Sequence, residues 1–546
     1  MVIPRVFNFR CIAGWTGLWL AATVAQAASY YVDSRAGDDQ AEGTSPAHAW
    51  HSLARAAQAH LQAGDSLLLA AGMKHTGGLR CESLAGTAGA PIVISSFTRP
   101  GDDPRACAQI DGRGEPAALA LRNCRYVRVE NLALTADGGA PTGSMRCGLL
   151  IEADGAGEYR GITLSRLQVR AVSFENPGYV RPAADVKTAN GTARYGWGIR
   201  VLVRDTAVLR DVAVRDCLVE RVDHTGLKFT APEGGIRDLV VENVQVSRSG
   251  GPGVQLSGVS GGRFTHLTVD HSGSTEDSRN WGRGSGLWTW GSSDIIIERS
   301  RFLNANGPGD SAGVHIDFNC RNVVVQYNLS ANNAGGFCEI LGNNHHCAYR
   351  YNISVNDGYR VKGRDGAFQE GKIFWLSGYV GQGRKPAGPF NSYFYNNTIY
   401  VGEGIDAKFA VAPSAEGVLI ANNIFCLVGS SSRVTGDQLR AEQAAAKPVE
   451  RALVTHNLFL RADNWPAGLG LQDAAPILGD PAFARPGGGE LADYTPRETA
   501  LVKDRGLKIP FIPGDPVGLA VGLEVTTDIL GRPVVGAPDL GAIELP

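Results

Sequence analysis

The 546-residue sequence has little methionine and no excess of charge of either sign. It contains 3 Met, and its 52 basic residues nearly balance 54 acidic ones, for a net charge of −2. This balance excludes the strongly basic surface that binds nucleic acid or an anionic membrane. It also gives no overall attraction to a polyanionic glycan, so such a substrate would need a local basic patch. Glycine is abundant, with 70 residues, which together with the scarcity of Met favours many tight turns and few helices.

After its first 27 residues, the sequence also lacks any apolar run long enough to cross a bilayer. At the N-terminus, Arg5 and Arg10 precede the apolar stretch 12–24, and Ala25-Gln26-Ala27 offers a small-residue cleavage site. This order is typical of a cleavable signal peptide covering residues 1–27, whereas a membrane anchor would need a longer apolar run. We therefore expect a secreted or periplasmic protein without a membrane span.

Ten cysteines occur, and none is paired as Cys-x-x-Cys, which argues against a structural zinc site. Removal of the signal peptide would take Cys11 and leave nine, an odd number. Cys81 and Cys107 flank an N-terminal segment and are the candidates for a disulfide in an oxidising compartment. Other cysteines lie in strand-like runs and are predicted to fill the core, namely Cys124, Cys217, Cys338 and Cys347.

Strand-like runs recur with a period of 27 or 28 residues. Equivalent alternating runs begin at Val212, Leu239, Ile295 and Val323, at offsets of 27, 56 and 28 residues, of which the middle one is two periods. Each run passes through a polar turn and ends in a glycine followed by a second short strand. A fixed period of this size, filled by strands, predicts a parallel β-helix in which each coil buries its inward side chains on its neighbours.

The chain divides around this repeat. Residues 28–111 form an N-terminal module in which Ser52–Leu61 has helical spacing, and we expect this helix to cap the open end of the solenoid. Residues 112–430 carry the coils, with loops on one face expected at about 174–194, 274–283 and 360–389. Residues 431–546 are expected to hold a short helix, the last strands and an irregular tail packed on the solenoid.

Segments near both termini resemble a known superfamily. The stretches YYVDSRAGDDQAEGTSPAHAWHSLARA, AGDSLLLAAG and GTAGAPIVISSF are similar to the first segment of secreted right-handed parallel β-helix proteins of the pectate-lyase-like superfamily. The tail Thr527–Leu545 is similar to the closing segment of the same proteins. The resemblance implies an all-β, right-handed parallel β-helix. It does not single out an activity, because the superfamily includes lyases, hydrolases, epimerases and non-catalytic members.

The glycine before the second strand of each coil predicts which side chains point outward. In four aligned triplets the middle residue points inward and the third outward, namely Gly226-Leu227-Lys228, Gly253-Val254-Gln255, Gly286-Leu287-Trp288 and Gly313-Val314-His315. A second outward column holds Thr230, Ser257, Trp290 and Asp317. The next coil places Cys338 inside and Phe337 and Glu339 outside. We therefore predict one exposed patch that contains Lys228, Trp288, Trp290, His315, Asp317 and Glu339.

Two carboxyl groups in this patch suit the hydrolysis of a glycosidic bond. Hydrolysis needs one protonated and one charged carboxyl group across the scissile oxygen. Asp317 and Glu339, on adjacent coils, are the predicted pair, with His315 tuning one of them. Trp288 and Trp290 offer flat apolar faces on which sugar rings stack. The leading hypothesis is a secreted enzyme that hydrolyses a polysaccharide, with Glu339, Asp317 and His315 as catalytic residues.

β-Elimination on a uronic acid polymer is the alternative hypothesis. It needs a cation that neutralises the carboxylate and a base at C5, for which Lys228, Arg283 or a bound Ca²⁺ would serve together with His315. No run of Asp forms a recognisable Ca²⁺ loop, so Ca²⁺ binding and the identity of any metal ligands stay open, and no cofactor is implied. Glu370, in the third predicted loop, is a further substrate-binding candidate.

A non-catalytic carbohydrate-binding or surface β-helix is the third hypothesis. In such a protein Trp288 and Trp290 would still bind sugar, while Asp317 and Glu339 would be replaceable. The same residues also have structural interpretations, because outward lysines and histidines are common on solvated sheet surfaces and Asp317 could cap a turn. All three hypotheses share a polysaccharide partner.

Overall fold

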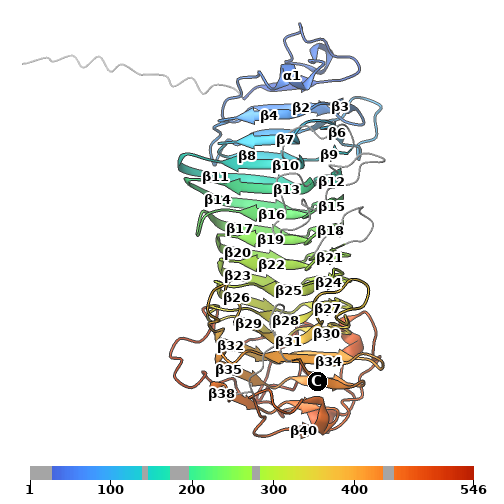
Figure 1. Cartoon of the computed structure of the whole chain (residues 1–546). Coiled ribbons are helices and arrows are strands. Elements are labelled where there is room, and N and C mark those ends of the chain that lie inside the picture. The colour runs from blue at the N-terminus through green and yellow to red at the C-terminus, as the bar shows by residue number, and fades with distance from the viewer. Residues whose placement is uncertain (1–26, 138–145, 173–195, 274–282, 435–447) are drawn as a thin grey trace, which may run out of the picture.

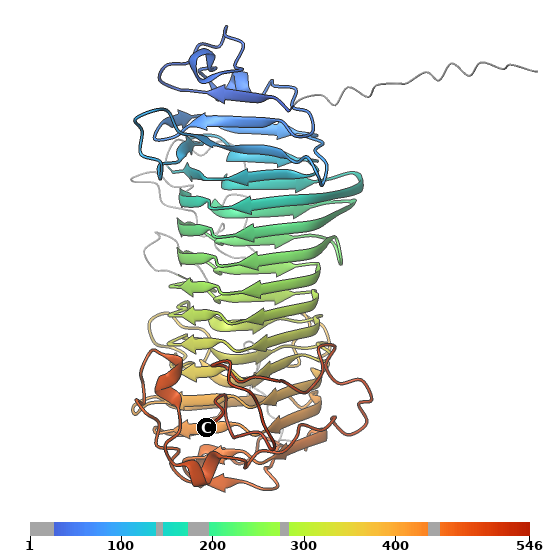
Figure 2. The same ribbon diagram turned by 180° about the vertical axis from the view of Figure 1, so that it is seen from behind.

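The repeat forms three parallel sheets that run side by side along one solenoid, as the computed structural model shows (Figure 1, and from behind in Figure 2). The structure describes residues 27–137, 146–172, 196–273, 283–434 and 448–546. Within them, 14 strands pair in chain order in sheet A, 14 in sheet B and 12 in sheet C. Each complete coil contributes one strand to each sheet, so a residue and its equivalent one coil later are parallel neighbours.

Sheet A consists of β1 (Ser29–Val32), β2 (Ser66–Ala70), β5 (Ile92–Phe97), β8 (Val127–Glu130), β11 (Ala156–Ser165), β14 (Thr206–Arg215), β17 (Ile236–Glu242), β20 (Val259–Thr265), β23 (Ser293–Glu298), β26 (Arg321–Gln326), β29 (Ala348–Arg350), β32 (Phe390–Tyr395), β35 (Glu416–Ala421) and β38 (Glu450–Thr455). Sheet B consists of β3 (Lys74–Thr76), β6 (Ala108–Asp111), β9 (Leu132–Ala136), β12 (Gln168–Val172), β15 (Leu218–Val222), β18 (Gln245–Ser249), β21 (Thr268–Asp270), β24 (Arg301–Leu303), β27 (Leu329–Ala331), β30 (Ile353–Val355), β33 (Thr398–Val401), β36 (Ile424–Leu427), β39 (Leu458–Phe459) and β40 (Ile477–Leu478). Sheet C consists of β4 (Leu79–Glu82), β7 (Ala117–Arg122), β10 (Arg146–Ala153), β13 (Gly196–Val203), β16 (Leu227–Thr230), β19 (Val254–Ser257), β22 (Leu287–Trp290), β25 (Ala312–Ile316), β28 (Gly336–Ile340), β31 (Lys372–Leu376), β34 (Ala407–Val411) and β37 (Ser431–Arg433).

Inward side chains stack from coil to coil and form the core. Apolar residues at equivalent positions of sheet A, such as Val212, Leu239 and Ile295, are all within 1% of full burial. Towards the C-terminus the stack becomes aromatic, and the rings of Phe394, Phe425 and Phe459 lie on one another. Each such side chain contributes roughly 1.5–3 kcal/mol by leaving water, which makes coil stacking the main source of stability.

A ladder of buried asparagines fixes the turn between sheets A and B. The backbone N–H of Asn352 donates to Oδ1 of Asn397 at 3.1 Å, and that of Asn397 donates to Oδ1 of Asn423 at 2.9 Å. Asn328 and Asn457 extend the ladder at its two ends. These bonds satisfy backbone groups that the turn would otherwise bury without a partner. Asn397 and Asn423 are therefore structural turn residues.

The expected N-terminal helical cap is wrong. Ser52 caps a helix as predicted, with its Oγ accepting from the Arg55 N–H at 3.1 Å, but that helix, α1 (Leu53–Ala56), is a single turn. One turn closes too few hydrogen bonds to persist without packing. The end of the solenoid is covered instead by apolar side chains, with Trp50 stacked on Tyr30 at 5.2 Å. The other helices of the described residues are also short, namely α2 (Thr499–Val502), η1 (Pro46–His48), η3 (Ala462–Asn464) and η4 (Leu491–Tyr494).

Two further expectations need correction. All nine cysteines of the described residues are free. Cys81 and Cys107 do not pair, because Cys81 faces the core on β4 beside Cys124 while Cys107 precedes β6 in another sheet. The interval 360–389 is not a loop throughout, since it contains β31 of sheet C.

Several expected segments lie outside the described residues. These are nearly all of the signal peptide (1–27), the loops at 174–194 and 274–283 apart from Arg283, and the short helix at 437–446. In the part of the chain that is described, no helix is both long enough and apolar enough to cross a membrane.

Candidate active site

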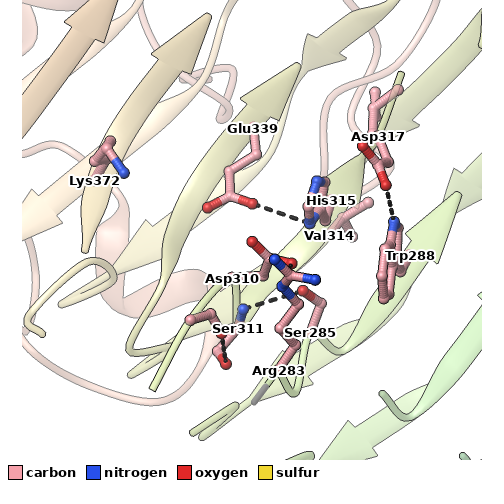
Figure 3. A network of polar contacts seen from close by, with 12 residues as sticks. Arg283, Ser285, Trp288, Asp310, Ser311, Val314, His315, Asp317, Glu339 and Lys372 are labelled. Carbon is pink, nitrogen blue, oxygen red and sulfur yellow. Dashed lines mark hydrogen bonds and ion pairs between the residues drawn. The ribbon is translucent and has the colours of Figure 1, made fainter. Parts of the chain in front are cut away.

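The outer face of sheet C carries the predicted column of side chains in the predicted register. Lys228 pairs with Gln255, Gln255 with Trp288, and Trp288 with His315. The column continues through Glu339, which pairs with His315 and lies one coil before Trp375. The Trp288 and His315 rings stack with their centroids 5.5 Å apart and their planes at 13°. Both residues are labelled in Figure 3. Alternation within strands therefore placed these residues correctly.

The column is buried rather than exposed, which corrects the predicted surface patch. Glu339 and His315 are each 1% exposed, and Asp317 is 7% exposed. Described segments contribute to this cover, because the turn 307–311 and the segment 360–371 hydrogen-bond to each other beside the sheet. Phe337, which alternation placed outside, instead packs in the core against Tyr349. The acids of this region therefore lie in a low-dielectric environment, where their chemistry departs from that of surface carboxyls.

Asp317 is held by two hydrogen bonds. Trp288 donates from Nε1 to its Oδ2 at 2.9 Å, and the Phe318 backbone N–H donates to its Oδ1 at 2.8 Å. Burial and the nearby Asp310 raise the pKa of Asp317 to about 7, against the opposing effect of these two bonds. At neutral pH the carboxyl group is therefore divided between its protonated and charged forms.

Glu339 faces His315 across one coil step. Its Oε2 lies 3.2 Å from Nδ1 of His315, but the two groups are not aligned for a hydrogen bond. Burial, followed by Asp310, raises the pKa of Glu339 to about 8, although Lys372 and Arg360 act in the opposite direction. Burial also lowers the pKa of His315 to about 4. At neutral pH, Glu339 is therefore mostly protonated and His315 is neutral.

Asp310 completes the cluster, and sequence reasoning missed it. It is 2% exposed and lies between Glu339 and Arg283 in Figure 3, with Nε of Arg283 2.9 Å from its Oδ2. A guanidinium at this distance favours the charged form of the Asp310 carboxyl group. The cluster therefore combines a charged carboxylate with a protonated carboxyl.

The backbone at Asp310 is strained. Asp310 and Ser311 have φ angles of 43° and 65°, in the left-handed region that residues other than glycine rarely adopt. Glycine is required beside this turn, because a Cβ on Gly335 would lie 1.6 Å from the Asp310 carbonyl oxygen. Single left-handed residues recur in the turns of this solenoid, but Asp310 and Ser311 are consecutive, and such a pair persists only where surrounding contacts impose it.

Arg360 supplies those contacts. Its guanidinium donates to the carbonyl oxygens of Gly307 at 2.7 Å and Asp310 at 2.9 Å. It also donates to Gln369, whose Oε1 in turn accepts the backbone N–H of Asp310. Arg360 is thus a buried cation that fixes the turn carrying Asp310.

The structure brings some predicted residues together and leaves others apart. Asp317, Glu339, His315, Trp288 and Arg283 belong to the cluster around Asp310 (Figure 3). The rest of the predicted set lies further off. Lys228 lies three coil steps from His315, roughly 14 Å at about 4.8 Å per coil.

Trp290 and Glu370 lie at the edges of the cluster. Trp290 is half-buried, and its ring meets Phe318 edge to face at 5.8 Å. Oε2 of Glu370 lies 3.6 Å from Nζ of Lys408 and accepts the Lys362 backbone N–H, so this carboxylate is engaged outside the cluster.

The missed residues share one property, namely that they lie in turns. Asp310 follows the Gly307-Pro308-Gly309 turn, and Arg360 follows Gly358 in an interval that was predicted to be a loop. Alternation predicts side-chain direction only within strands, so it assigns none to either residue. A charged residue beside a Gly-Pro-Gly turn was the available signal for Asp310.

No group of three or more His, Cys, Asp or Glu in the described residues is arranged to hold a metal ion. The acids of the cluster are instead accompanied by basic side chains. Arg283 pairs with Asp310, and Arg360 and Lys372 both act on Glu339.

Comparisons with known proteins match this fold. The family described as "Right handed beta helix region" matches residues 197–366. The chain is also 24% identical, over 96% of its length, to a lacto-N-biosidase from Bifidobacterium longum subsp. longum, of which it spans 37%.

Among solved structures, the GH136 lacto-N-biosidase from Eubacterium ramulus is 18% identical, with a TM-score of 0.49 over 74% of this chain and 68% of that one. Pectate lyase Pel9A is 13% identical, with a TM-score of 0.40 over 95% and 96%. The family match and the three parallel sheets make this chain a right-handed β-helix protein, as its resemblance to the pectate-lyase-like superfamily implied.

Proposed function

We propose that this protein is a secreted or periplasmic glycoside hydrolase that cleaves a neutral oligosaccharide at the cluster of Asp310, Asp317 and Glu339. The observation that supports this proposal most strongly is one buried cluster with two different acids. Asp310 pairs with Arg283, and the pKa of Glu339 is raised to about 8. Glycosidic hydrolysis needs such a charged and protonated pair at neutral pH. The distant similarity to lacto-N-biosidases, which are glycoside hydrolases, supports the same reaction class.

Each acid has a role that follows from its environment. Protonated Glu339 would donate its proton to the glycosidic oxygen as that bond breaks. Asp310, kept charged by Arg283, would stabilise the positive charge that develops on the sugar ring. Asp317, with a pKa of about 7, would in its charged form accept the proton that water loses as it attacks the sugar. His315, which is neutral at neutral pH, would pack beside Glu339 without adding a charge to the cluster.

β-Elimination has less support from this geometry. Neither cation predicted to neutralise a uronic acid carboxylate is available at the cluster, since Lys228 lies three coil steps from His315 and Arg283 pairs with Asp310. A non-catalytic binding role could use the half-buried Trp290, but it does not explain the strained turn at Asp310 or the buried carboxyl groups of Asp317 and Glu339.

The test is a product screen with matched variants. Purified protein is incubated with neutral oligosaccharides and with uronic acid polymers, while reducing ends and near-ultraviolet absorbance are measured. We expect new reducing ends from neutral substrates without absorbance. Glu339→Gln and Asp310→Asn should each lower kcat by about 10²- to 10⁴-fold.

Glu298→Gln is the matched control, because Glu298 is a similarly buried glutamate on β23, in a different sheet from the cluster. It should retain full activity. An unsaturated product that absorbs in the near ultraviolet would show that the reaction is elimination and not hydrolysis. Full activity in both cluster variants would show that the cluster takes no part in the reaction.

A further inference from the structure

A long groove runs along the solenoid beside the acid cluster. Its volume is 1260 Å³, and its lining includes one residue at or just beyond the end of each of five consecutive strands of sheet C, namely Thr230, Ser257, Trp290, Asn319 and Asn343. These strands, β16, β19, β22, β25 and β28, are stacked in order in Figure 1. Five coils at about 4.8 Å per step give the groove a length of roughly 19 Å. It is therefore an extended channel parallel to the solenoid axis.

The groove and the cluster share one strand and one turn. Trp290 lines the groove and lies two residues after Trp288, whose indole donates to Asp317. Phe318 follows Asp317 directly, and its ring packs against Trp290 at 5.8 Å. None of the acids of the cluster lines the groove, and the groove adjoins the cluster through the contact of Trp290 with Phe318, the residue next to Asp317.

The lining is amphipathic and carries both signs of charge. Trp290 gives it a half-buried aromatic wall, and hydroxyl groups of Ser257, Ser260 and Ser293 line it from neighbouring coils. Its charged side chains are of both signs, for example Asp294 and the exposed Arg384. A polyanion would require a surface of positive sign, whereas hydroxyl-rich rings with apolar faces match this mixture.

We propose that the groove binds several further sugar units of a neutral oligosaccharide, with Trp290 as a stacking platform, so that the protein prefers chains longer than a disaccharide. This proposal rests on the proposed function, because it assumes that the scissile bond lies at the cluster. Affinity should therefore rise with chain length until the groove is filled.

The experiment separates binding from catalysis. Neutral oligosaccharides of two to six units are titrated into Glu339→Gln protein, and tryptophan fluorescence or heat reports the dissociation constant. Tightening with length is expected. Adding Trp290→Ala should weaken binding of the longest chains roughly tenfold and leave disaccharide binding unchanged.

One control variant, one second groove variant and one control ligand accompany this measurement. Phe511→Ala removes an aromatic ring that is 54% exposed outside the groove lining, and it should change nothing. Arg384→Ala alters an exposed groove residue and should weaken only the long chains, which covers the case in which Trp290→Ala folds poorly. Uronic acid oligomers of equal length should bind at least tenfold more weakly than neutral ones.

The outcomes distinguish the two proposals. If the protein hydrolyses nothing but its length-dependent binding needs Trp290, the hydrolase proposal fails and the groove proposal stands. If the protein hydrolyses neutral oligosaccharides while both groove variants bind every length like the parent, the groove proposal fails alone. Equal affinity for disaccharide and hexasaccharide in the parent protein would also overturn it.

Discussion

Replacing Glu339 with Gln should make the protein more stable at alkaline pH while it removes activity. Burial raises the pKa of this carboxyl from an ordinary 4.5 to about 8. An acid with a raised pKa takes up a proton on folding, so its contribution to stability is unimpaired below pH 4.5 and falls as the pH rises to about 8. At about 1.36 kcal/mol per pH unit, the loss reaches on the order of 5 kcal/mol above pH 8.

The substitution isolates this pH-dependent loss of stability, because glutamine keeps the shape of the Glu339 side chain and removes its charge. Oε2 of Glu339 makes no hydrogen bond within the described residues, so little else is lost. Urea denaturation followed by circular dichroism at pH 5 and pH 8.5 measures the effect. We expect similar urea midpoints at pH 5 and a clearly higher midpoint for Glu339→Gln at pH 8.5.

Glu298→Gln should behave in the opposite way. Glu298 is also buried, but its carboxylate accepts a hydrogen bond from Gln326 at 2.7 Å and pairs with Arg263. Removing its charge should lower stability by about 1 kcal/mol at both pH values. The reasoning is refuted if Glu339→Gln is less stable than the parent at pH 8.5, because the carboxylate would then be a stabilising structural ion.

Two further predictions concern the support of the site and of the fold. Arg360→Lys keeps the charge but loses the planar fork that binds the Gly307 and Asp310 carbonyl oxygens, so kcat should fall more than tenfold while far-ultraviolet circular dichroism is unchanged; an unchanged kcat would show that the strained turn needs no such clamp. Asn397→Ala breaks two rungs of the buried asparagine ladder and should cost about 2–4 kcal/mol in urea denaturation, whereas the exposed Asn343→Ala should cost less than half as much. Equal losses in the two asparagine variants would contradict the structural role of the ladder.

The register of the site could be predicted because it depends on local properties. A glycine at the same place in each coil and strict alternation after it sufficed to align Trp288 with His315. In the next coil the same rule placed Cys338 and Glu339 correctly but failed for Phe337. Gly336 adopts a φ of 148°, and the residue that follows, Phe337, turns into the core. Alternation predicts side-chain direction only while the backbone stays extended. The sequence Gly335-Gly336 alone does not indicate that the backbone departs from this conformation.

Burial and partners could not be predicted in the same way. Asp310 owes its position to Arg360, which lies 50 residues later in the sequence and reaches it only once the coils have stacked. Similarly, the expected cap helix at Ser52–Leu61 has the right N-cap and spacing, yet it ends after one turn. A pattern in a single sequence predicts which face of a strand a side chain occupies. It does not predict which residue of another coil packs against that side chain.

A solenoid is a suitable support for a site whose buried acids reduce the stability of the fold. The cluster gathers Asp310, Asp317 and Glu339 out of water, and the raised pKa values of the last two measure how unfavourable their charged forms are there. Arg283 and Arg360 offset part of this cost, but each is anchored on a different coil. The acids are therefore held together only if the coils keep their register, which the aromatic stack and the buried asparagines enforce along the whole length. Stability supplied by repetition thus allows strain and buried charge at one place, where they can serve catalysis.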